Sequence, residues 1–306
     1  ADRFVLGAAS LARLLGAPPL LVGITIVGIG TSAPEILVSL SASLTGKPTL
    51  AVGNALGSNI TNLALVLGTT ALITPLAVSS GILRRELPLV LAVSVMAGLF
   101  CLDRSLARWE GSLLILGFVG VLVWMFQLAR AGHHDDPMIA EISAHEGDPV
   151  LPRPRALLWI AVGLILLPLS AQVLVWGATT IAEQLGVSEL VIGLTVVAIG
   201  TSLPELAASL AGAARGEPDI ALGNVLGSNL FNLLLVLGIP AVIAAPALEA
   251  DVILRDVPVM LGLTVIVFIM AWGWRGPGKI TRLEGAALLG AFVAYELILA
   301  ASMNLL

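Results

Sequence analysis

Apolar residues gather in long blocks along this chain, and short polar segments separate the blocks. Each block runs for about 20 residues, the length of a helix that crosses a bilayer. The alternation of polar and apolar residues that marks a transmembrane barrel strand is absent from the sequence. The pattern therefore predicts an all-α integral membrane protein. Ten transmembrane helices are expected, at residues 1–15, 19–44, 48–75, 87–102, 110–129, 156–185, 189–214, 218–245, 257–274 and 283–300.

Composition agrees with this prediction. The mean hydropathy is +1.03 and only 11% of the residues are charged, whereas a soluble domain carries about 25%. The lipid bilayer is therefore an expected partner, and the lack of a basic face argues against nucleic acid. The histidines, His133, His134 and His145, all lie in one polar loop. Because hydrolytic and zinc enzymes need such groups in their active sites, we expect no enzyme and no cofactor.

One stretch of the sequence occurs twice. Residues 23–68 and 193–238 align without a gap at an offset of 170, and 26 of 46 positions are identical. The identities concentrate in two polar motifs, GTSxPE and GNxLGSNxxN, that interrupt strongly apolar segments. The shared polar residues are Thr31, Ser32, Glu35, Asn54, Ser58, Asn59 and Asn62 in the first copy and Thr201, Ser202, Glu205, Asn224, Ser228, Asn229 and Asn232 in the second.

The repeat predicts how the chain is organised. Each half holds five expected helices, and an odd number makes the second half cross the membrane in the opposite sense. We expect a first transmembrane repeat at residues 1–130, a linker at 131–155 and a second transmembrane repeat at 156–306. Residues 1–18 align with 171–188, so the lead-in 156–170 has no counterpart. The first helix is therefore expected to be truncated at its N-terminus.

Basic residues predict the orientation. If the 131–155 linker is cytoplasmic, ten of the 15 Lys and Arg residues lie at inner helix ends, as the positive-inside rule requires. The C-terminus is then outside. The pairs Arg85–Glu86 and Arg255–Asp256 stand at expected helix starts, and we interpret them as interfacial anchors.

Two acidic residues carry the candidate chemistry. Glu35 and Glu205 occupy matching positions in the two halves, at membrane depth. An ionised carboxylate there costs roughly 3 kcal/mol or more unless it meets a partner. The four repeat helices 19–44, 48–75, 189–214 and 218–245 contain no Lys or Arg. The expected partner is therefore a transported cation or a proton.

The residues around each glutamate sharpen this hypothesis. Pro34 and Pro204 lack an N–H and are expected to break their helices, so that main-chain carbonyls at 28–31 and 198–201 reach the site. In the next helix Ser58 and Asn62 are four residues apart and share one face. Carboxylate, carbonyl, hydroxyl and amide oxygens are the ligands of hard cations such as Ca²⁺ and Na⁺.

The other polar and small residues that the two copies share have structural interpretations. The amides that lie on other helix faces are expected to hydrogen-bond the broken helix ends. The glycines at four-residue spacing are expected to let helices approach closely. These amides are Asn54, Asn59, Asn224 and Asn229, and these glycines are Gly53, Gly57, Gly223 and Gly227.

These duplicated motifs resemble the repeats of the Ca²⁺/cation antiporter superfamily, specifically its Na⁺/Ca²⁺ exchanger branch in prokaryotes. The resemblance implies a ten-helix antiporter of the plasma membrane, working by alternating access, in which the helices at 1–15 and 156–185 slide against the rest. Carried over residue by residue, it places Ca²⁺ on Glu35, Glu205 and the carbonyls of Thr31 and Thr201. It places Na⁺ on these groups with Ser32, Ser58, Ser202, Ser228 and the carbonyls of Gly28 and Ala198, and Asn62 and Asn232 at the central position.

Some relatives have Asp where this chain has Asn232. With two carboxylates the site balances one Ca²⁺ or two Na⁺, so K⁺ co-transport is not expected. A Ca²⁺/H⁺ exchanger could use the same two glutamates as proton carriers, and a channel would conduct without obligatory exchange. We expect the protein to function as a monomer.

Overall fold

The structure is a computed structural model that describes residues 2–15, 22–78, 85–130, 151–272 and 278–302. Helices dominate these residues, and seven of them are long and apolar enough to cross a membrane. The expected number of ten stays a prediction. The three histidines, most of the expected linker and the first residues of the expected helix 19–44 lie outside the described residues, as do the last residues of the expected helix 257–274.

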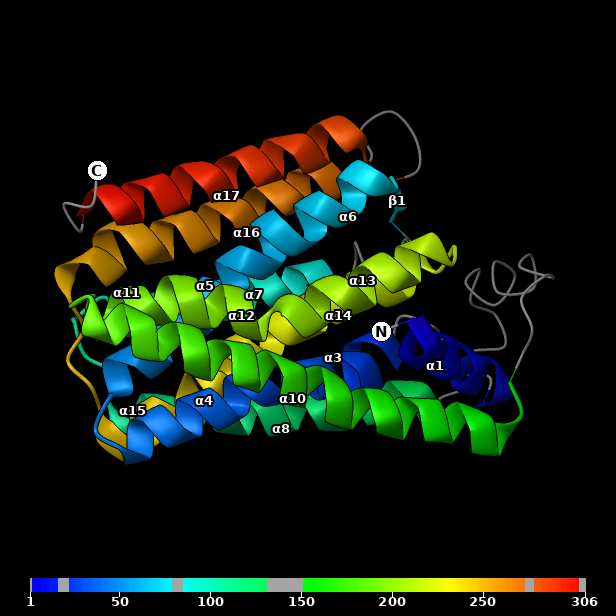
Figure 1. The fold of residues 1–306 in the computed structure, drawn as a ribbon, viewed down its shortest axis with the longest axis horizontal. Coiled ribbons are helices and arrows are strands. Elements are labelled where there is room, and N and C mark those ends of the chain that lie inside the picture. The colour runs from blue at the N-terminus through cyan, green and yellow to red at the C-terminus, as the bar shows by residue number, and fades with distance from the viewer. Residues whose placement is uncertain (1, 16–21, 79–84, 131–150, 273–277, 303–306) are drawn as a thin grey trace.

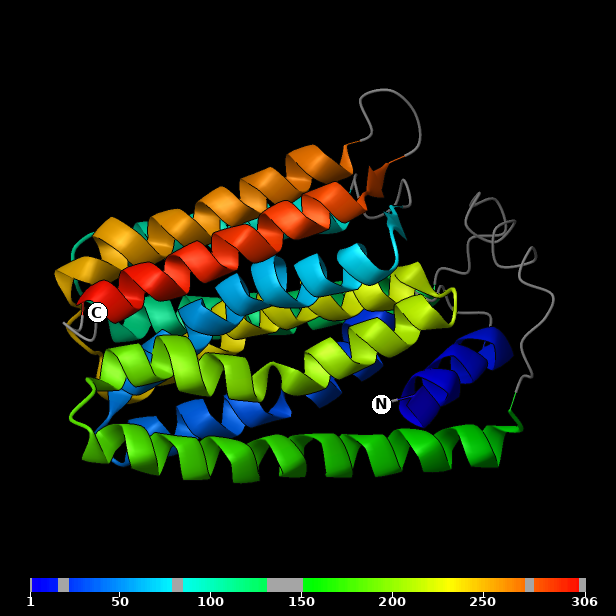
Figure 2. The same cartoon turned by 45° about the horizontal axis from the view of Figure 1, so that its top comes forward.

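Helices from both ends of the chain form the two edges of the bundle (Figure 1). Along one edge α1 (Asp2–Leu15) packs against the long helix α10 (Arg153–Gln184). Figure 2 shows α16 (Val257–Ala271) and α17 (Arg282–Ser302) on the opposite side of the molecule. The helices of the duplicated stretch lie between these edges, and 78% of the most apolar window of Pro48–Ile73 and of Pro218–Ala244 is buried.

The duplicated stretch folds in the same way in both copies. Each copy has a helix that breaks and restarts, followed by a helix with a π-helical segment (η) in its middle. In the first copy these are η1 (Gly23–Val27), α3 (Gly28–Thr31), α4 (Ala33–Leu44), α5 (Pro48–Thr61), η2 (Asn62–Val66) and α6 (Leu67–Ile73). In the second they are α11 (Glu189–Ile192), η4 (Gly193–Val197), α12 (Ala198–Thr201), α13 (Leu203–Ala214), α14 (Pro218–Phe231), η5 (Asn232–Val236) and α15 (Gly238–Ala244).

The predicted helix breaks are confirmed, two residues before each proline. Ser32 leaves the helical region at φ −80° and ψ 4°, and Ser202 does so at φ −82° and ψ 2°. Pro34 and Pro204 then stand in the first turn of the next helix, where a missing N–H costs nothing. Each break thus lets a new helix begin just before the glutamate of its copy.

Two glycines let the copies pack on each other. A Cβ atom on Gly57 of α5 would lie 2.7 Å from the Cα atom of Leu194 in η4. A Cβ atom on Gly227 of α14 would lie 2.8 Å from the carbonyl oxygen of Ile24 in η1. No side chain fits at these separations, so the predicted close approach is confirmed. The second helix of each copy therefore lies directly on the broken helix of the other copy.

Two features were not part of the all-α prediction. The two-residue strands β1 (Leu76–Ala77) and β2 (Lys279–Ile280) pair antiparallel, because α6 packs on α17 and the segments at their ends must satisfy main-chain groups. The π-helical segments were not expected either. A further one, η6 (Val252–Asp256), lies directly before α16 and extends that helix at its N-terminus. The remaining described helices are α7 (Leu87–Cys101) and α8 (Arg108–Arg130).

The interpretation of Asp256 as an interfacial anchor is wrong. Its side chain is fully buried and accepts hydrogen bonds from Arg255 Nε at 2.7 Å and from the Tyr295 hydroxyl at 2.9 Å. These donors explain how the carboxylate is tolerated inside the bundle. Its counterpart Glu86 is also buried, whereas Arg85 is exposed.

Candidate ion-binding site

Both glutamates of the duplicated motif lie at the start of a helix in the centre of the bundle. Glu35 is in the first turn of α4 and Glu205 is in the first turn of α13. Neither side chain has any exposed surface. Main-chain N–H groups at a helix start favour a negative charge, so each helix break offsets part of the cost of burying its acid.

Side chains of the two copies meet at Glu205. Its Oε1 atom accepts a hydrogen bond from the Ser32 hydroxyl of the first copy at 3.1 Å and from the Ser228 hydroxyl at 3.2 Å. On the other side, the Ser58 and Thr201 hydroxyl oxygens are 3.4 Å apart. The site is therefore one cluster built by both halves of the chain.

The main-chain carbonyls before each break also have partners. The Gly28 carbonyl accepts the Ser32 N–H at 3.0 Å, and the Ala198 carbonyl accepts the Ser202 N–H at 3.1 Å. The Thr31 hydroxyl is 3.3 Å from the Gly28 carbonyl, but Asn224 Oδ1 is a nearer acceptor for its one proton, at 3.0 Å. A carbonyl oxygen has two lone pairs, so these carbonyls can still serve as cation ligands.

Several oxygen atoms of the motif residues are buried without a hydrogen-bond partner among the described residues. Buried polar atoms in proteins nearly always have a partner, so the arrangement indicates a site for a ligand that accepts electron pairs. Within the described chain no group of three His, Cys, Asp or Glu residues could hold a metal, so neutral oxygens must complete the set. The atoms are both carboxylate oxygens of Glu35, Oε2 of Glu205, Oγ of Ser202 and the amide oxygens of Asn62 and Asn232.

The asparagines of the motif behave in two ways. Asn54 and Asn224 donate to the main-chain carbonyls of the two glutamates, at 3.2 and 3.1 Å, so the prediction that they bond the broken helix ends is confirmed. For Asn59 it is wrong, because Asn59 donates to Ala55 of its own helix at 2.8 Å. The side-chain amide of Asn229 has no hydrogen-bond partner among the described residues.

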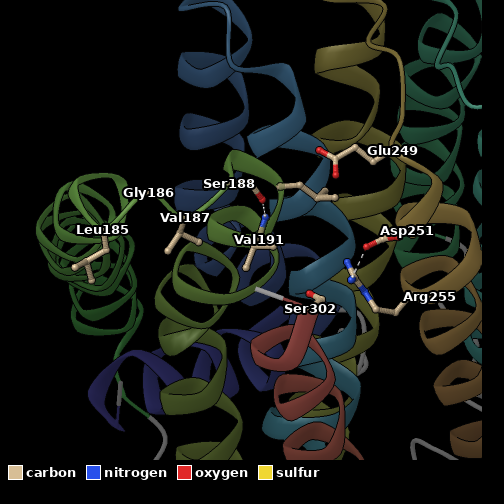
Figure 3. A pocket seen from close by; sticks show the side chains of 10 residues that line it. Leu185, Gly186, Val187, Ser188, Val191, Glu249, Asp251, Arg255 and Ser302 are labelled. Carbon is tan, nitrogen blue, oxygen red and sulfur yellow. Dashed lines mark hydrogen bonds and ion pairs between the residues drawn. The ribbon is translucent and has the colours of Figure 1, made fainter. Parts of the chain in front are cut away.

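A surface cavity of about 300 Å³ lies away from this cluster, at one end of the bundle. Figure 3 shows Asp251 beside Arg255 in its lining, and the two groups are 2.9 Å apart. Glu249 and Ser188 also line the cavity. Its basic group is already paired with carboxylates, and neither Glu35 nor Glu205 lines it, so the buried cluster is the better candidate site.

A second cavity of about 300 Å³ lies between α10 and the α4–α5 hairpin. Its lining includes Val38, which follows Glu35 by three residues, and Val197, whose carbonyl accepts the Thr201 hydroxyl at 2.9 Å. Gln172 and Thr179 also line it, and each has a buried oxygen without a hydrogen-bond partner in the described part of the chain. This polar cavity thus reaches within about one helical turn of the cluster.

Known proteins resemble this chain over nearly its whole length. The family model described as sodium/calcium exchanger protein matches residues 1–127 and 155–301. CaxA of Alkalimonas amylolytica is 49% identical over 99% of this chain and 94% of its own length, and the inner membrane protein YrbG of Escherichia coli is 44% identical over 96% and 90%. The solved structure of the sodium-calcium exchanger NCX_Mj has a TM-score of 0.77 at 31% identity and covers 96% of this chain and 91% of its own. This chain therefore belongs to the sodium/calcium exchanger protein family, a family of membrane antiporters.

Proposed function

We propose that this protein exchanges Na⁺ for Ca²⁺ across the membrane by alternating access, with both ions competing for the buried cluster. The observation that carries the proposal is the set of unpartnered carboxylate oxygens on Glu35 and Glu205, together with the Ser32 and Ser228 hydroxyls, one from each half, that donate to Glu205. Such oxygen sets suit hard cations. The proposed ligands are Glu35, Glu205, Thr31, Thr201, Ser32, Ser202, Ser58, Ser228, Asn62, Asn232, Gly28 and Ala198.

The charge of the cluster supports Na⁺ and Ca²⁺ as the exchanged ions. Two carboxylates neutralise one Ca²⁺ or two Na⁺, so either load leaves the buried site uncharged. Asn62 and Asn232 are neutral and add no further negative charge. A K⁺ ion bound together with Ca²⁺ would leave an uncompensated charge at depth, which is costly. Exchange without K⁺ is therefore the proposed mode.

The proposed architecture is ten helices in two inverted five-helix repeats, at 1–130 and 156–306, joined by a cytoplasmic linker at 131–155. The matching breaks at Ser32 and Ser202 support it, since inverted repeats of transporters place broken helices around a site at mid-membrane. The C-terminus is then outside, in the plasma membrane of a prokaryote, and the cluster needs no second copy of the chain.

Alternating access would move α1 and α10 against the rest of the bundle. Two ion pairs tie α1 to the turn between α13 and α14: Arg13 to Glu217 at 2.5 Å and Asp2 to Arg215 at 2.6 Å. The cavity beside α10 offers a route to the cluster at another face of the same helix pair. These pairs must break when α1 moves, so they favour the conformation in which they form.

Reversing one of these charges should therefore shift the equilibrium between the conformations open to the two faces of the membrane. Glu217→Arg places like charges together, and a pair of this kind contributes about 0.2–1 kcal/mol, enough for a shift of at most about fivefold. We expect the Ca²⁺ concentration for half-maximal uptake to rise at one face and fall at the other. Right-side-out and inside-out vesicles measure the two values separately.

The swap Arg13→Glu with Glu217→Arg should restore both values, because the pair forms again with its charges exchanged. Asp251→Asn is the matched control, since it breaks a pair that touches neither α1 nor the turn. A folding defect would lower the amount of active protein without moving the two values in opposite directions. Values that the swap leaves unrestored would exclude this role for the pair.

The coupling ion is tested by ⁴⁵Ca²⁺ uptake into proteoliposomes of the full-length protein. One set carries an outward Na⁺ gradient and the other an outward H⁺ gradient, each with the other ion balanced. We expect uptake with the Na⁺ gradient alone. Uptake driven only by protons would keep the two glutamates as carriers but make the protein a Ca²⁺/H⁺ exchanger, and uptake without any gradient requirement would indicate a channel.

A further inference from the structure

A chain of hydrogen bonds crosses between the two copies through the buried side-chain amides of Asn54 and Asn224. Asn54 Nδ2 donates to the main-chain carbonyl of Glu35, in its own half, at 3.2 Å. Asn54 Oδ1 lies 3.3 Å from the hydroxyl of Thr201, in the other half, and accepts its proton when this hydroxyl turns away from the Val197 carbonyl, 2.9 Å from it. One amide thus joins the helix of the first glutamate to the segment just before the second.

Asn224 makes the reciprocal contacts. Its Nδ2 donates to the main-chain carbonyl of Glu205 at 3.1 Å, and its Oδ1 accepts the Thr31 hydroxyl at 3.0 Å. Each threonine precedes the glutamate of its own copy by four residues. The four hydrogen bonds therefore close a ring that runs from one glutamate to the other and back.

An asparagine is required at both corners of this ring. The side-chain amide donates from one end and accepts at the other, and each end here has its own partner. Aspartate has no donor when it is ionised, and leucine, of similar size, has neither group. The geometry also fixes the orientation of both amides, since the carbonyl needs a donor and the hydroxyl supplies one.

We infer that Asn54 and Asn224 are positioning residues that hold the two glutamates at the separation a single Ca²⁺ requires, and so favour Ca²⁺ over Na⁺. The inference rests on the proposed function, because it takes Glu35 and Glu205 to share the ion. Ca²⁺ binds its oxygens at about 2.3–2.6 Å, so both carboxylates must be correctly placed at once. A Na⁺ ion balances one carboxylate and depends less on the relation between the halves.

The test measures ⁴⁵Ca²⁺ and ²²Na⁺ binding to the purified full-length protein. Asn54→Leu and Asn224→Leu are expected to raise the Kd for Ca²⁺ about ten- to a hundredfold, the usual effect of losing a group that orients a metal ligand. The Kd for Na⁺ should rise less. Asn59→Leu is the matched control, because this buried amide of the same helix bonds only its own helix, at Ala55.

Milder variants keep the test decisive if a leucine variant fails to fold. Thr201→Val and Thr31→Val each remove one hydroxyl of the ring and keep the shape and the main-chain carbonyl. Each should weaken Ca²⁺ binding more than Na⁺ binding. Adding Thr201→Val to Asn54→Leu should cost little more than Asn54→Leu alone, because both changes break the same link.

The outcomes separate the inference from the proposed function. Unchanged Ca²⁺ binding in folded ring variants would overturn the inference. A loss of Ca²⁺ binding in Asn59→Leu equal to that in Asn54→Leu would overturn it too. In both cases Ca²⁺ binding by the wild type would still support the proposed site. Equal losses of Ca²⁺ and Na⁺ binding would overturn the claim about selectivity. A wild-type protein that binds no Ca²⁺ would refute the proposed function, and the inference with it.

Discussion

Replacing either Glu35 or Glu205 with glutamine is expected to abolish Ca²⁺ exchange. Each change removes half of the negative charge that would balance the ion, and leaving a buried charge without its partner costs about 3–5 kcal/mol. The Kd for Ca²⁺ should therefore rise by about two to four orders of magnitude. Equilibrium ⁴⁵Ca²⁺ binding and Na⁺-driven uptake both measure the loss.

The two glutamine variants should nonetheless fold. No ion pair to either glutamate is found among the described residues, and the amide keeps the size of the acid. Melting temperatures close to that of the wild type would show this. Glu296→Gln is the matched control, since Glu296 is another acid of a membrane helix, has a buried oxygen without a partner in the described chain, and lies outside the cluster. Normal Ca²⁺ transport by both site variants would contradict the assignment of Glu35 and Glu205 as ligands of the transported ion.

Gly57→Ala and Gly227→Ala are expected to lower the stability of the whole bundle. The added Cβ atom would stand 2.7 Å from Leu194 Cα in the first variant and 2.8 Å from the Ile24 carbonyl oxygen in the second. Both obstacles are main chain, which cannot rotate away, so each variant should lose about 1–3 kcal/mol. Thermal unfolding in detergent measures the loss.

Transport should fall with stability in the Gly57→Ala variant. Ser58 follows directly, and its hydroxyl oxygen lies 3.4 Å from that of Thr201, so a shift of α5 changes the cluster. Gly262→Ala on α16 is the control, because a Cβ atom there meets nothing within 4 Å. Alanine favours helix by about 1 kcal/mol over glycine, so this variant should be neutral or more stable. An equal loss in all three variants would contradict the packing argument.

Some of this structure could be predicted because its causes are local. Pro34 and Pro204 break their helices through their own covalent geometry, and Asn54 and Asn224 donate to the main-chain carbonyls of the glutamates that follow those breaks. The close packing at Gly57 is similarly predictable, since only a missing side chain allows it.

Other features depend on contacts that a linear pattern does not contain. Asp256 stands at a helix start in the sequence, but Tyr295, which lies 39 residues further along, makes its burial tolerable. The π-helical segments have no compositional signature, because packing decides where one extra residue enters a turn. The cross-copy ring was missed for the same reason, since its threonine contacts span 147 and 193 residues.

The unequal burial of the helices has a mechanical consequence. In its most apolar window, 78% of the segment Pro48–Ile73 is buried in protein, against 29% of the segment Arg153–Ala182 within α10. Large apolar side chains such as Ile165, Leu169 and Trp176 of α10 face outward, where acyl chains would surround them. A helix that moves against fluid lipid on most of its surface meets friction set by the membrane itself. The turnover of the exchanger should therefore follow acyl-chain length and viscosity, while ion affinity at the rigid centre should not.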